Sequence, residues 1–186
     1  MISEIHENQP KTALIIVDMQ YDFCPGGALA VPDGDAVIPV INRLMGEYPV
    51  VVTTQDWHPA NHCSFTAQGG PWPPHCVEHT HGAELHADLN RAPITYQLHK
   101  PDNPDKETYS AFEDTDLADR LRSMGVTDTV VVGLATDYCV KHTALAALSA
   151  GFGVTVAADG CRAVNVSPDD GERALEELRS KGVRVV

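Results

Sequence analysis

The sequence predicts an α/β fold, in which a mostly parallel sheet of about six strands carries helices on both faces. Two observations predict this three-layer, Rossmann-like sandwich: short apolar runs rich in β-branched residues recur along the chain, and segments with helical spacing separate them. Such runs suit strands that are buried on both faces, and their alternation with helices is typical of a parallel sheet. The predicted strands cover residues 13–17, 50–54, 94–98, 129–132, 154–157 and 183–186.

Four helices are predicted between these strands, at residues 36–48, 116–124, 138–150 and 168–181. Pro49 closes the first helix, because proline cannot continue a helix. Ser167 is the predicted N-cap of the last helix, with Pro168 in its first turn. A glycine that can adopt a positive φ follows each of the last three helices. These glycines are Gly125, Gly151 and Gly182.

Length and composition restrict the class of protein. A chain of 186 residues fits one domain, expected to span 1–186 with a short extension over 1–10. The formal net charge of -13 disfavours nucleic acid and anionic membranes as partners. No apolar run is long enough to cross a bilayer, and the first residues do not resemble a secretory signal. Five cysteines, an odd number spread along the chain, favour a cytoplasmic protein over a disulfide scaffold. The charge does not decide between a monomer and a homo-oligomer.

One long segment, residues 55–92, interrupts the alternation and contains six of the nine histidines. A loop of this length inside a domain is usually functional or disordered, and its aromatic residues favour order. Asp56 and His58 lie two residues apart, so in an extended chain their side chains point to one side. His75, in a proline-stiffened stretch, adds a third candidate ligand. One carboxylate and two imidazoles fit a catalytic site for one divalent ion, Zn, Fe or Mn. His62 is a candidate fourth ligand or a partner of a ligand.

Polar residues follow several predicted strands, namely Asp18, Asp56, Lys100 and the segment 133–139. Ligands of open α/β sheets bind outside the carboxyl ends of the strands, so these residues are expected to converge. Cys139 lies at the predicted start of a helix, where the helix dipole and free N–H groups stabilise a thiolate and can hold an oxyanion. Asp18 as base and Lys100 as orienting cation would complete a triad. By position alone, a buried structural cysteine and an Asp18–Lys100 salt bridge remain the more common arrangements.

A set of motifs then resembles a known family. In order along the chain they are Asp18-Met19-Gln20-Tyr21-Asp22-Phe23, Asp56-Trp57-His58-Pro59, Trp72-Pro73-Pro74-His75-Cys76, Lys100, Tyr109-Ser110-Ala111-Phe112 and Gly133-Leu134-Ala135-Thr136-Asp137-Tyr138-Cys139. They are similar to those of bacterial nicotinamidases, pyrazinamidase-type enzymes of the isochorismatase-like hydrolase superfamily. The resemblance extends from about residue 11 to the C-terminus. The Asp-x-His and Trp-Pro-x-His-Cys elements are the ones that indicate nicotinamidase within the superfamily.

The resemblance implies an activity and a role for each motif residue. The activity is hydrolysis of nicotinamide to nicotinate and ammonia through a cysteine thioester, a step of NAD salvage, with pyrazinamide as a further substrate. The implied catalytic residues are Asp18, Lys100 and Cys139, and the implied metal ligands are Asp56, His58 and His75. The implied oxyanion hole is formed by the N–H groups of Ala135 and Cys139, beside a cis peptide bond between Leu134 and Ala135. The implied substrate-binding residues are Phe23, Leu29, Trp72, Tyr109, Ala135 and Tyr138.

Two alternative functions stay open at this point. Another cysteine amidohydrolase of the superfamily, acting on a carbamoyl or ureido substrate, would keep the Asp, Lys and Cys motifs. The predicted metal ligands argue against that alternative. A non-catalytic metal- or ligand-binding protein on the same fold would need no reactive thiol.

Two positions also depart from the common pattern of the family: Cys63 stands where many relatives have a small residue, and Tyr138 stands where some have histidine.

Overall fold

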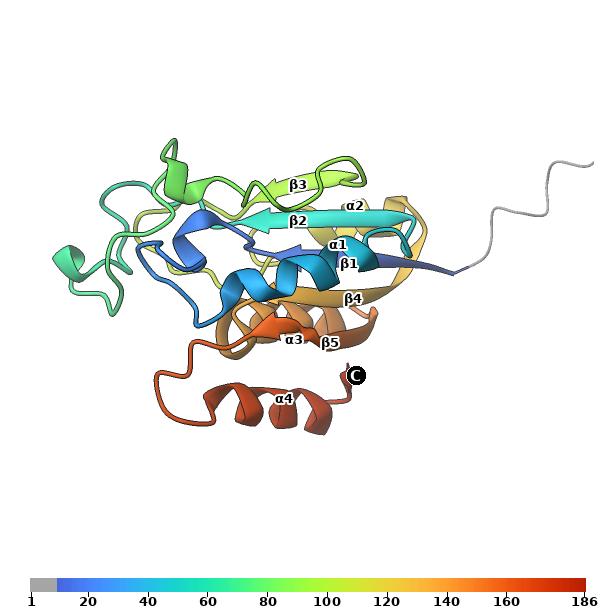
Figure 1. Cartoon of the computed structure of the whole chain (residues 1–186). Coiled ribbons are helices and arrows are strands. Elements are labelled where there is room, and N and C mark those ends of the chain that lie inside the picture. Colours follow the sequence, from blue (N-terminus) through green and yellow to red (C-terminus); the bar gives the residue numbers. More distant parts are fainter. Residues whose placement is uncertain (1–9) are drawn as a thin grey trace, which may run out of the picture.

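A six-stranded sheet forms the middle layer of the computed structural model, which describes residues 10–186 (Figure 1). Its strand order is β3-β2-β1-β4-β5-β6, and every described pairing is parallel. The strands are β1 (Lys11–Val17), β2 (Val50–Gln55), β3 (Tyr96–His99), β4 (Val126–Leu134), β5 (Gly153–Arg162) and β6 (Arg184–Val185). The predicted extension over residues 1–10 lies outside the described residues except for Pro10.

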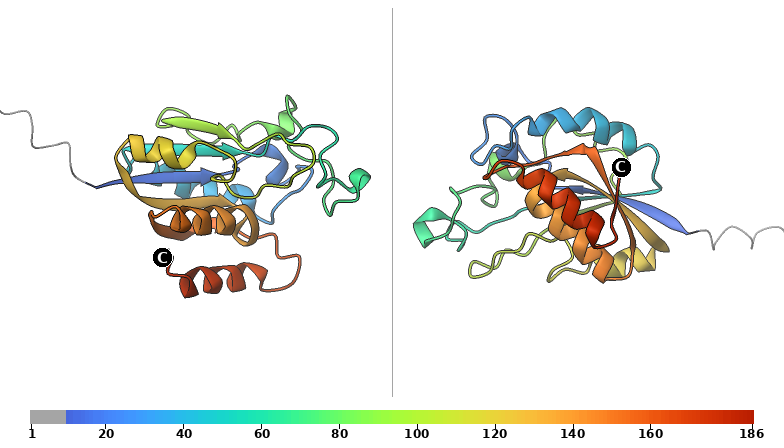
Figure 2. Two further views of the ribbon diagram at one scale, coloured as in Figure 1. Left: turned by 180° about the vertical axis from the view of Figure 1, so that it is seen from behind. Right: turned by 90° about the horizontal axis from the view of Figure 1, so that it is seen from below.

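Helices cover both faces of this sheet, which confirms the predicted fold class. One face carries α1 (Ile38–Leu44). The opposite face carries α2 (Leu117–Ser123), α3 (Lys141–Ser149) and α4 (Asp170–Ser180), with α3 and α4 side by side (Figure 2). This distribution follows from the strand order, because right-handed crossovers that leave β1 and β4 in opposite directions place their helices on opposite faces.

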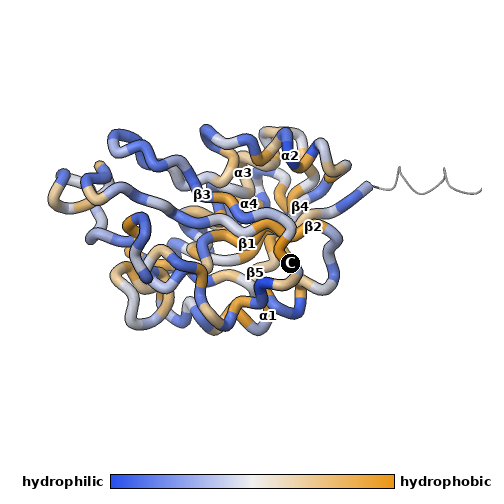
Figure 3. The backbone as a smooth tube through the Cα atoms, turned by 90° about the horizontal axis from the view of Figure 1, so that it is seen from above, coloured by the Kyte–Doolittle hydropathy of each residue, from blue (hydrophilic) through white to orange (hydrophobic). Residues whose placement is uncertain are grey.

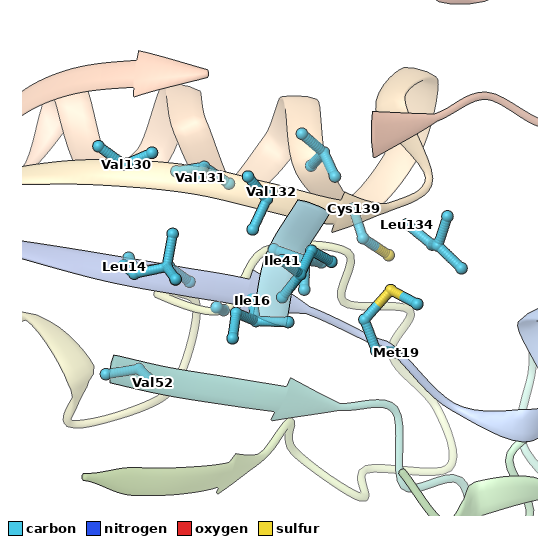
Figure 4. Close-up of a cluster of buried hydrophobic side chains, with 14 of the residues drawn as sticks. Leu14, Ile16, Met19, Ile41, Val52, Val130, Val131, Val132, Leu134 and Cys139 are labelled. Atoms are coloured by element: carbon cyan, nitrogen blue, oxygen red, sulfur yellow. The ribbon is translucent and has the colours of Figure 1, made fainter. Parts of the chain in front are cut away.

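The core lies along the central strands. Residues Ala13–Val17 of β1 are fully buried, since β1 pairs with β2 on one side and β4 on the other and both its faces are covered. Their apolar, β-branched side chains meet those of the neighbouring strands and of α1, around Ile16, Ile41 and Val132 (Figure 4). In Figure 3 the hydrophobic segments accordingly follow the sheet, and hydrophilic segments dominate the loops. The continuous apolar runs of the sequence are therefore explained by burial on both faces.

Helix ends agree in part with the predictions. Gly125, Gly151 and Gly182 each adopt a positive φ directly after a helix C-cap residue, as predicted. The first helix is shorter than predicted, because a 3-10 turn (Gly34–Val37) precedes it and Pro39 occupies its first turn. The prediction of Ser167 as the N-cap of the last helix is wrong. The helix α4 begins at Asp170, and the backbone N–H of Ser167 donates to the Asp170 carboxylate.

The sheet reverses its winding direction between β1 and β4, and the carboxyl ends of all strands lie at one edge (Figure 1). The long segment between β2 and β3 lies at this edge, with two 3-10 turns, Thr66–Gln68 and His81–Ala83. Its side chains Phe65, Leu85 and Leu89 are buried. Ligand sites of open α/β sheets form at such a switch point.

Gly133, near the end of β4, is expected to tolerate no side chain. Its φ is +113°, and a Cβ there would lie 2.2 Å from the Val17 carbonyl oxygen. We expect Gly133→Ala to lower the free energy of unfolding by about 3 kcal/mol or more, from left-handed strain and overpacking together. Urea denaturation measures this. Gly151→Ala is the matched control, because Gly151 also has a positive φ but a Cβ on it would meet no atom within 4 Å. Its expected cost is about 1–2 kcal/mol, and equal losses for both variants would contradict the packing argument.

Candidate active site

Three charged residues that directly follow strands meet at the carboxyl edge of the sheet. Asp18 follows β1, Asp56 follows β2 and Lys100 follows β3. Lys100 Nζ donates to Asp18 Oδ2 at 2.5 Å and to Asp56 Oδ1 at 2.8 Å, and none of the three is more than 4% exposed. Thr54 Oγ1 donates to the other oxygen of Asp18 at 2.7 Å. One buried cation thus neutralises part of the charge of two buried carboxylates, which would be costly to bury alone.

Cys139 completes this group from the other side of the switch point. It lies in a π-helical turn, Thr136–Val140, between β4 and α3, and is 5% exposed. Its Sγ and carboxylate oxygens of Asp18 and Asp56 all lie within 4.8 Å of one another. Figure 4 shows Cys139 at the end of the apolar cluster formed by the central strands. The structure therefore brings the three predicted catalytic residues together.

The ionisation of Cys139 differs from the expectation of a thiolate held by a helix start. The helix α3 begins only at Lys141, and burial raises the pKa of the Cys139 thiol well above its usual range. Lys100 opposes that rise, but Asp18 and Asp56 add to it. Burial thus favours the thiol form of Cys139, and a neighbouring base would assist formation of the nucleophilic thiolate.

Asp18 has the properties of that base. Burial raises its pKa above the usual carboxyl range, an effect that Lys100 opposes and Asp56 strengthens. Burial alone would lower the pKa of Lys100, yet the adjacent carboxylates of Asp18 and Asp56 outweigh it and raise this pKa well above normal. The ammonium group therefore stays charged, and a carboxyl group with a raised pKa accepts a proton more readily than an ordinary one.

A second group, Asp56, His58 and His75, has the arrangement of a metal site. One donor atom of each lies within 4.8 Å of the others, and Asp56 Oδ2 is 3.4 Å from His58 Nε2 and 4.0 Å from His75 Nε2. His75 Nδ1 is 2.8 Å from the Pro73 carbonyl oxygen, which orients Nε2 towards the group. Both ring nitrogens of His58 are buried without a hydrogen-bond partner among the described residues. A buried imidazole of this kind is costly unless it binds a ligand, so the residues fit a metal ion.

His62 lies beside this group rather than within it. Its ring stacks on that of His58 with centroids 4.0 Å apart. Its Nδ1 is 2.7 Å from Ser64 Oγ, and its Nε2 is 3.1 Å from the Lys106 carbonyl oxygen. Both nitrogens thus have protein partners, and His62 would have to give up one of them to bind a metal.

A cavity opens onto Cys139 and onto the metal-site residues Asp56 and His75. All six predicted substrate-binding residues line it: Phe23, Leu29, Trp72, Tyr109, Ala135 and Tyr138. Four further lining residues were not predicted: Val31, Glu107, Leu134 and Val164. Val31 and Val164 are ordinary apolar residues and Glu107 stands two residues before a motif, so these three carried no sequence signal of their own. Leu134 lies within the motif 133–139 but was not assigned to the cavity.

Aromatic side chains form one wall of this cavity in a connected arrangement. Trp72 Nε1 donates to Tyr109 Oη at 3.2 Å. The ring of Tyr138 meets Trp72 edge-on, with centroids 5.2 Å apart. Phe23 also lines the cavity, with its ring centroid 5.6 Å from that of His75. Such a cavity, lined mainly by apolar and aromatic side chains with a few polar groups, suits a small flat ring compound.

The segment that presents Cys139 has the backbone geometry implied by the resemblance. The peptide bond between Leu134 and Ala135 is cis, which confirms that expectation. The Ala135 carbonyl oxygen accepts hydrogen bonds from the backbone N–H groups of Tyr138 and Val140, each at 3.1 Å. The turn is thereby closed just ahead of α3, with Ala135 and Cys139 both at the cavity.

The fold and the site together define a class of protein: a doubly wound α/β protein with a buried cysteine, carboxylate and lysine beside a metal-binding group. Comparison with known families specifies the class further. The Isochorismatase domain family matches residues 12–186, and the chain belongs to this family.

Relatives and solved structures of this family are similar over nearly the whole chain. Nicotinamidase from Escherichia coli (strain K12) is 45% identical over 200 residues, which covers 93% of each chain. The crystal structure of pyrazinamidase of Pyrococcus horikoshii in complex with zinc is 49% identical, with a TM-score of 0.88, and covers 95% of this chain and 99% of that one. PnC1 from L. infantum in complex with nicotinate is 42% identical, with a TM-score of 0.91, over 95% of this chain and 92% of that one.

Within residues 10–186, no helix has the length and apolar character that a membrane span requires.

Proposed function

We propose that the protein is a nicotinamidase, which hydrolyses nicotinamide to nicotinate and ammonia and also accepts pyrazinamide. The observation that carries this proposal is the aromatic-walled cavity that ends on Cys139, with Asp18 and Lys100 within the same buried group. The similarity to nicotinamidase and pyrazinamidase, over more than nine-tenths of the chain, supports the substrate. The nicotinate in the L. infantum structure is the product of the proposed reaction.

The proposed reaction has two halves, and Asp18 moves the proton in both. First, Asp18 takes the proton of the Cys139 thiol, and the sulfur forms a bond to the carboxamide carbon of nicotinamide. As the tetrahedral adduct collapses, the carbon–nitrogen bond breaks, and Asp18 returns its proton so that ammonia leaves. A water molecule then gives a proton to Asp18 and attacks the thioester carbon. As the carbon–sulfur bond breaks, Asp18 returns this proton to the Cys139 sulfur, which regenerates the thiol, and the acid leaves as nicotinate after losing its proton to solvent.

Lys100 and the turn before α3 would stabilise the charges of these steps. Lys100 holds Asp18 in place through the 2.5 Å ion pair and remains cationic beside the developing thiolate. The backbone N–H groups of Ala135 and Cys139 would form the oxyanion hole, where fixed donors stabilise the tetrahedral adduct. In the cavity, Phe23 and Trp72 would enclose the ring of the substrate. Leu29, Tyr109, Ala135 and Tyr138 would complete the binding surface.

Asp56, His58 and His75 would hold one divalent ion, Zn, Fe or Mn, beside this cavity. The unpartnered nitrogens of His58 and the zinc in the P. horikoshii structure support this part of the proposal. When bound, the ion supplies a positive charge that can orient or polarise a substrate at the base of the cavity. His62 would support His58 by stacking, with both its nitrogens engaged as described above.

The wider setting of the reaction also belongs to the proposal. We place it in cytoplasmic NAD salvage, carried out by a single domain over residues 1–186 that is a monomer or a homo-oligomer. The net charge of -13 supports the expectation that neither nucleic acid nor an anionic membrane is a partner.

Ammonia release from nicotinamide, pyrazinamide and a panel of carbamoyl and ureido compounds tests the proposed function. We expect release from nicotinamide and pyrazinamide, together with about one equivalent of bound divalent metal. Absence of release from both amides would refute the assignment. Release from carbamoyl or ureido compounds, without stoichiometric metal, would favour the other cysteine amidohydrolases of the superfamily. Alkylation of Cys139 that nicotinamide blocks would argue against a non-catalytic binding protein.

A further inference from the structure

Gln20 is a fully buried amide whose hydrogen bonds all go to backbone groups near the metal site. It lies two residues after Asp18 and is 0% exposed. Its Oε1 accepts the Asp56 N–H at 2.8 Å, and its Nε2 donates to the Asp56 carbonyl oxygen at 2.8 Å. The same Nε2 also donates to the Ala83 carbonyl oxygen at 2.9 Å. Both N–H donors of the amide and its oxygen are therefore used, so the side chain has one defined orientation.

These hydrogen bonds fix the backbone of Asp56 on both sides of its Cα. The N–H and C=O groups of one residue are held by one side chain, so neither peptide plane next to Asp56 can rotate without breaking a buried hydrogen bond. The Asp56 side chain has little freedom of its own to compensate. Its Oδ1 is committed to Lys100 at 2.8 Å, and its Oδ2 faces His58 and His75. A small backbone shift at Asp56 would therefore disturb the lysine contact and the metal-site geometry together.

A second buried amide reinforces the hydrogen bonds that Gln20 makes to Asp56; Gln20 and these bonds are called the Gln20 clamp below. Gln55, the residue before Asp56, is 2% exposed, and its Nε2 donates to the same Ala83 carbonyl oxygen at 2.7 Å. Two buried amides thus converge on one acceptor in the 3-10 turn His81–Ala83. These bonds join the end of β1, the end of β2 and the loop 55–92.

We propose that Gln20 is a positioning residue that fixes Asp56 between Lys100 and the metal-site histidines, and so couples metal binding to the geometry of the catalytic group. This inference rests on the proposed function for the role of the metal. Gln20 lies outside the cavity lining, and its side-chain hydrogen bonds reach Asp56 rather than Lys100 or the histidines, so it acts through Asp56.

Two substitutions separate the parts of this clamp. Gln20→Met keeps a side chain of similar length and removes all three hydrogen bonds. Gln20→Glu retains an acceptor for the Asp56 N–H but sets a carboxylate against two carbonyl oxygens. Asn42→Ala is a control for the loss of a side chain that bonds backbone groups: the partly buried Asn42 donates to the Asp88 carbonyl oxygen and accepts from the Asn90 N–H at 2.8 Å each, outside the cavity lining.

The test measures Zn²⁺ affinity by chelator competition and the visible spectrum of the Co²⁺-substituted protein, alongside kcat/KM for nicotinamide. We expect both Gln20 variants to bind Zn²⁺ about 10–100-fold more weakly, with an altered Co²⁺ spectrum and kcat/KM reduced by a similar factor. Asn42→Ala should change none of the three. Folded Gln20 variants with wild-type Zn²⁺ affinity and spectrum would overturn the inference. A wild type that binds no Zn²⁺ or Co²⁺ would instead refute the metal site of the proposed function.

Discussion

Cys139→Ala is expected to reduce ammonia release from nicotinamide by at least about 10⁴-fold, because loss of a nucleophile removes the covalent route altogether. The protein should remain folded, since the side chain loses only its sulfur atom. Bound metal should be retained, because Cys139 is not one of the residues Asp56, His58 and His75. A steady-state ammonia assay, metal analysis and thermal unfolding measure the three quantities on one preparation.

Cys161→Ala is the matched control for this substitution. Cys161 is also buried, at 4% exposed, but it lies in β5 outside the cavity lining. Burial raises its pKa to about 12, so it too is a neutral thiol. We expect near wild-type turnover in this control. Cys139→Ala with turnover close to that of Cys161→Ala would show that another group is the nucleophile.

Lys100→Met should impair both activity and stability. The substitution leaves Asp18 and Asp56 buried without the cation that contacts both of them. Removing one partner of a buried ion pair typically costs about 3–5 kcal/mol, because the remaining charge is uncompensated. We therefore expect a loss of this size in the free energy of unfolding, measured by urea denaturation with a chelator present. Ammonia release should fall by at least about 10²-fold, because Asp18 loses the partner that holds it.

The stability loss in Lys100→Met should depend on pH. Burial already raises the pKa of Asp18, and removal of Lys100 takes away the largest effect that lowers it. A carboxyl group whose pKa is higher in the folded than in the unfolded protein contributes stability below the unfolded value of about 4, and that contribution is lost as pH rises towards the folded value. The difference between wild type and variant should therefore shrink as pH falls from about 7 towards about 4.

Lys141→Met is a control for the loss of a lysine charge. Lys141 forms a partly exposed ion pair with Glu177 at 3.2 Å on the surface between α3 and α4. Exposed pairs of this kind contribute about 0–1 kcal/mol. A pH-independent loss in Lys100→Met, or one no larger than in Lys141→Met, would contradict the role of Lys100 as the shared counter-ion of two buried carboxylates.

Local patterns were sufficient for the layers of this fold and for the candidate polar residues at the strand ends, whereas the roles of the site residues came from the family resemblance. The strand at 13–17 and the helix ending at Gly125 were predictable because hydrophobic spacing and a positive-φ glycine act within a few residues. The helix start at Ser167 was not, since the side chain of Asp170 binds the Ser167 N–H and the helix begins later. Short-range capping signals do not tell which of two neighbouring polar residues will form the hydrogen bond.

The protonation of Cys139 depends on packing that its position in the sequence does not reveal. Its position before a helix predicted a stabilised thiolate, but Cys139 lies in a buried π-helical turn, where burial raises the pKa of its thiol. Burial depends on how the sheet, α3 and the loops pack, and the cost of desolvating a thiolate exceeds the effect of a nearby helix start. The requirement for Asp18 as a base follows from that packing.

By itself, the sequence determined which residue types stand at the strand ends and therefore which chemistry is available: one thiol, two carboxylates, one lysine and a histidine-rich loop. Only the tertiary structure decided which of these groups contact one another. Lys100 contacts Asp18 and Asp56 across 82 and 44 residues of chain, and Gln20 clamps Asp56 across 36. Contacts between residues so distant in sequence leave no periodic or capping signal, because they form only when the parallel strands align in register at one edge of the sheet.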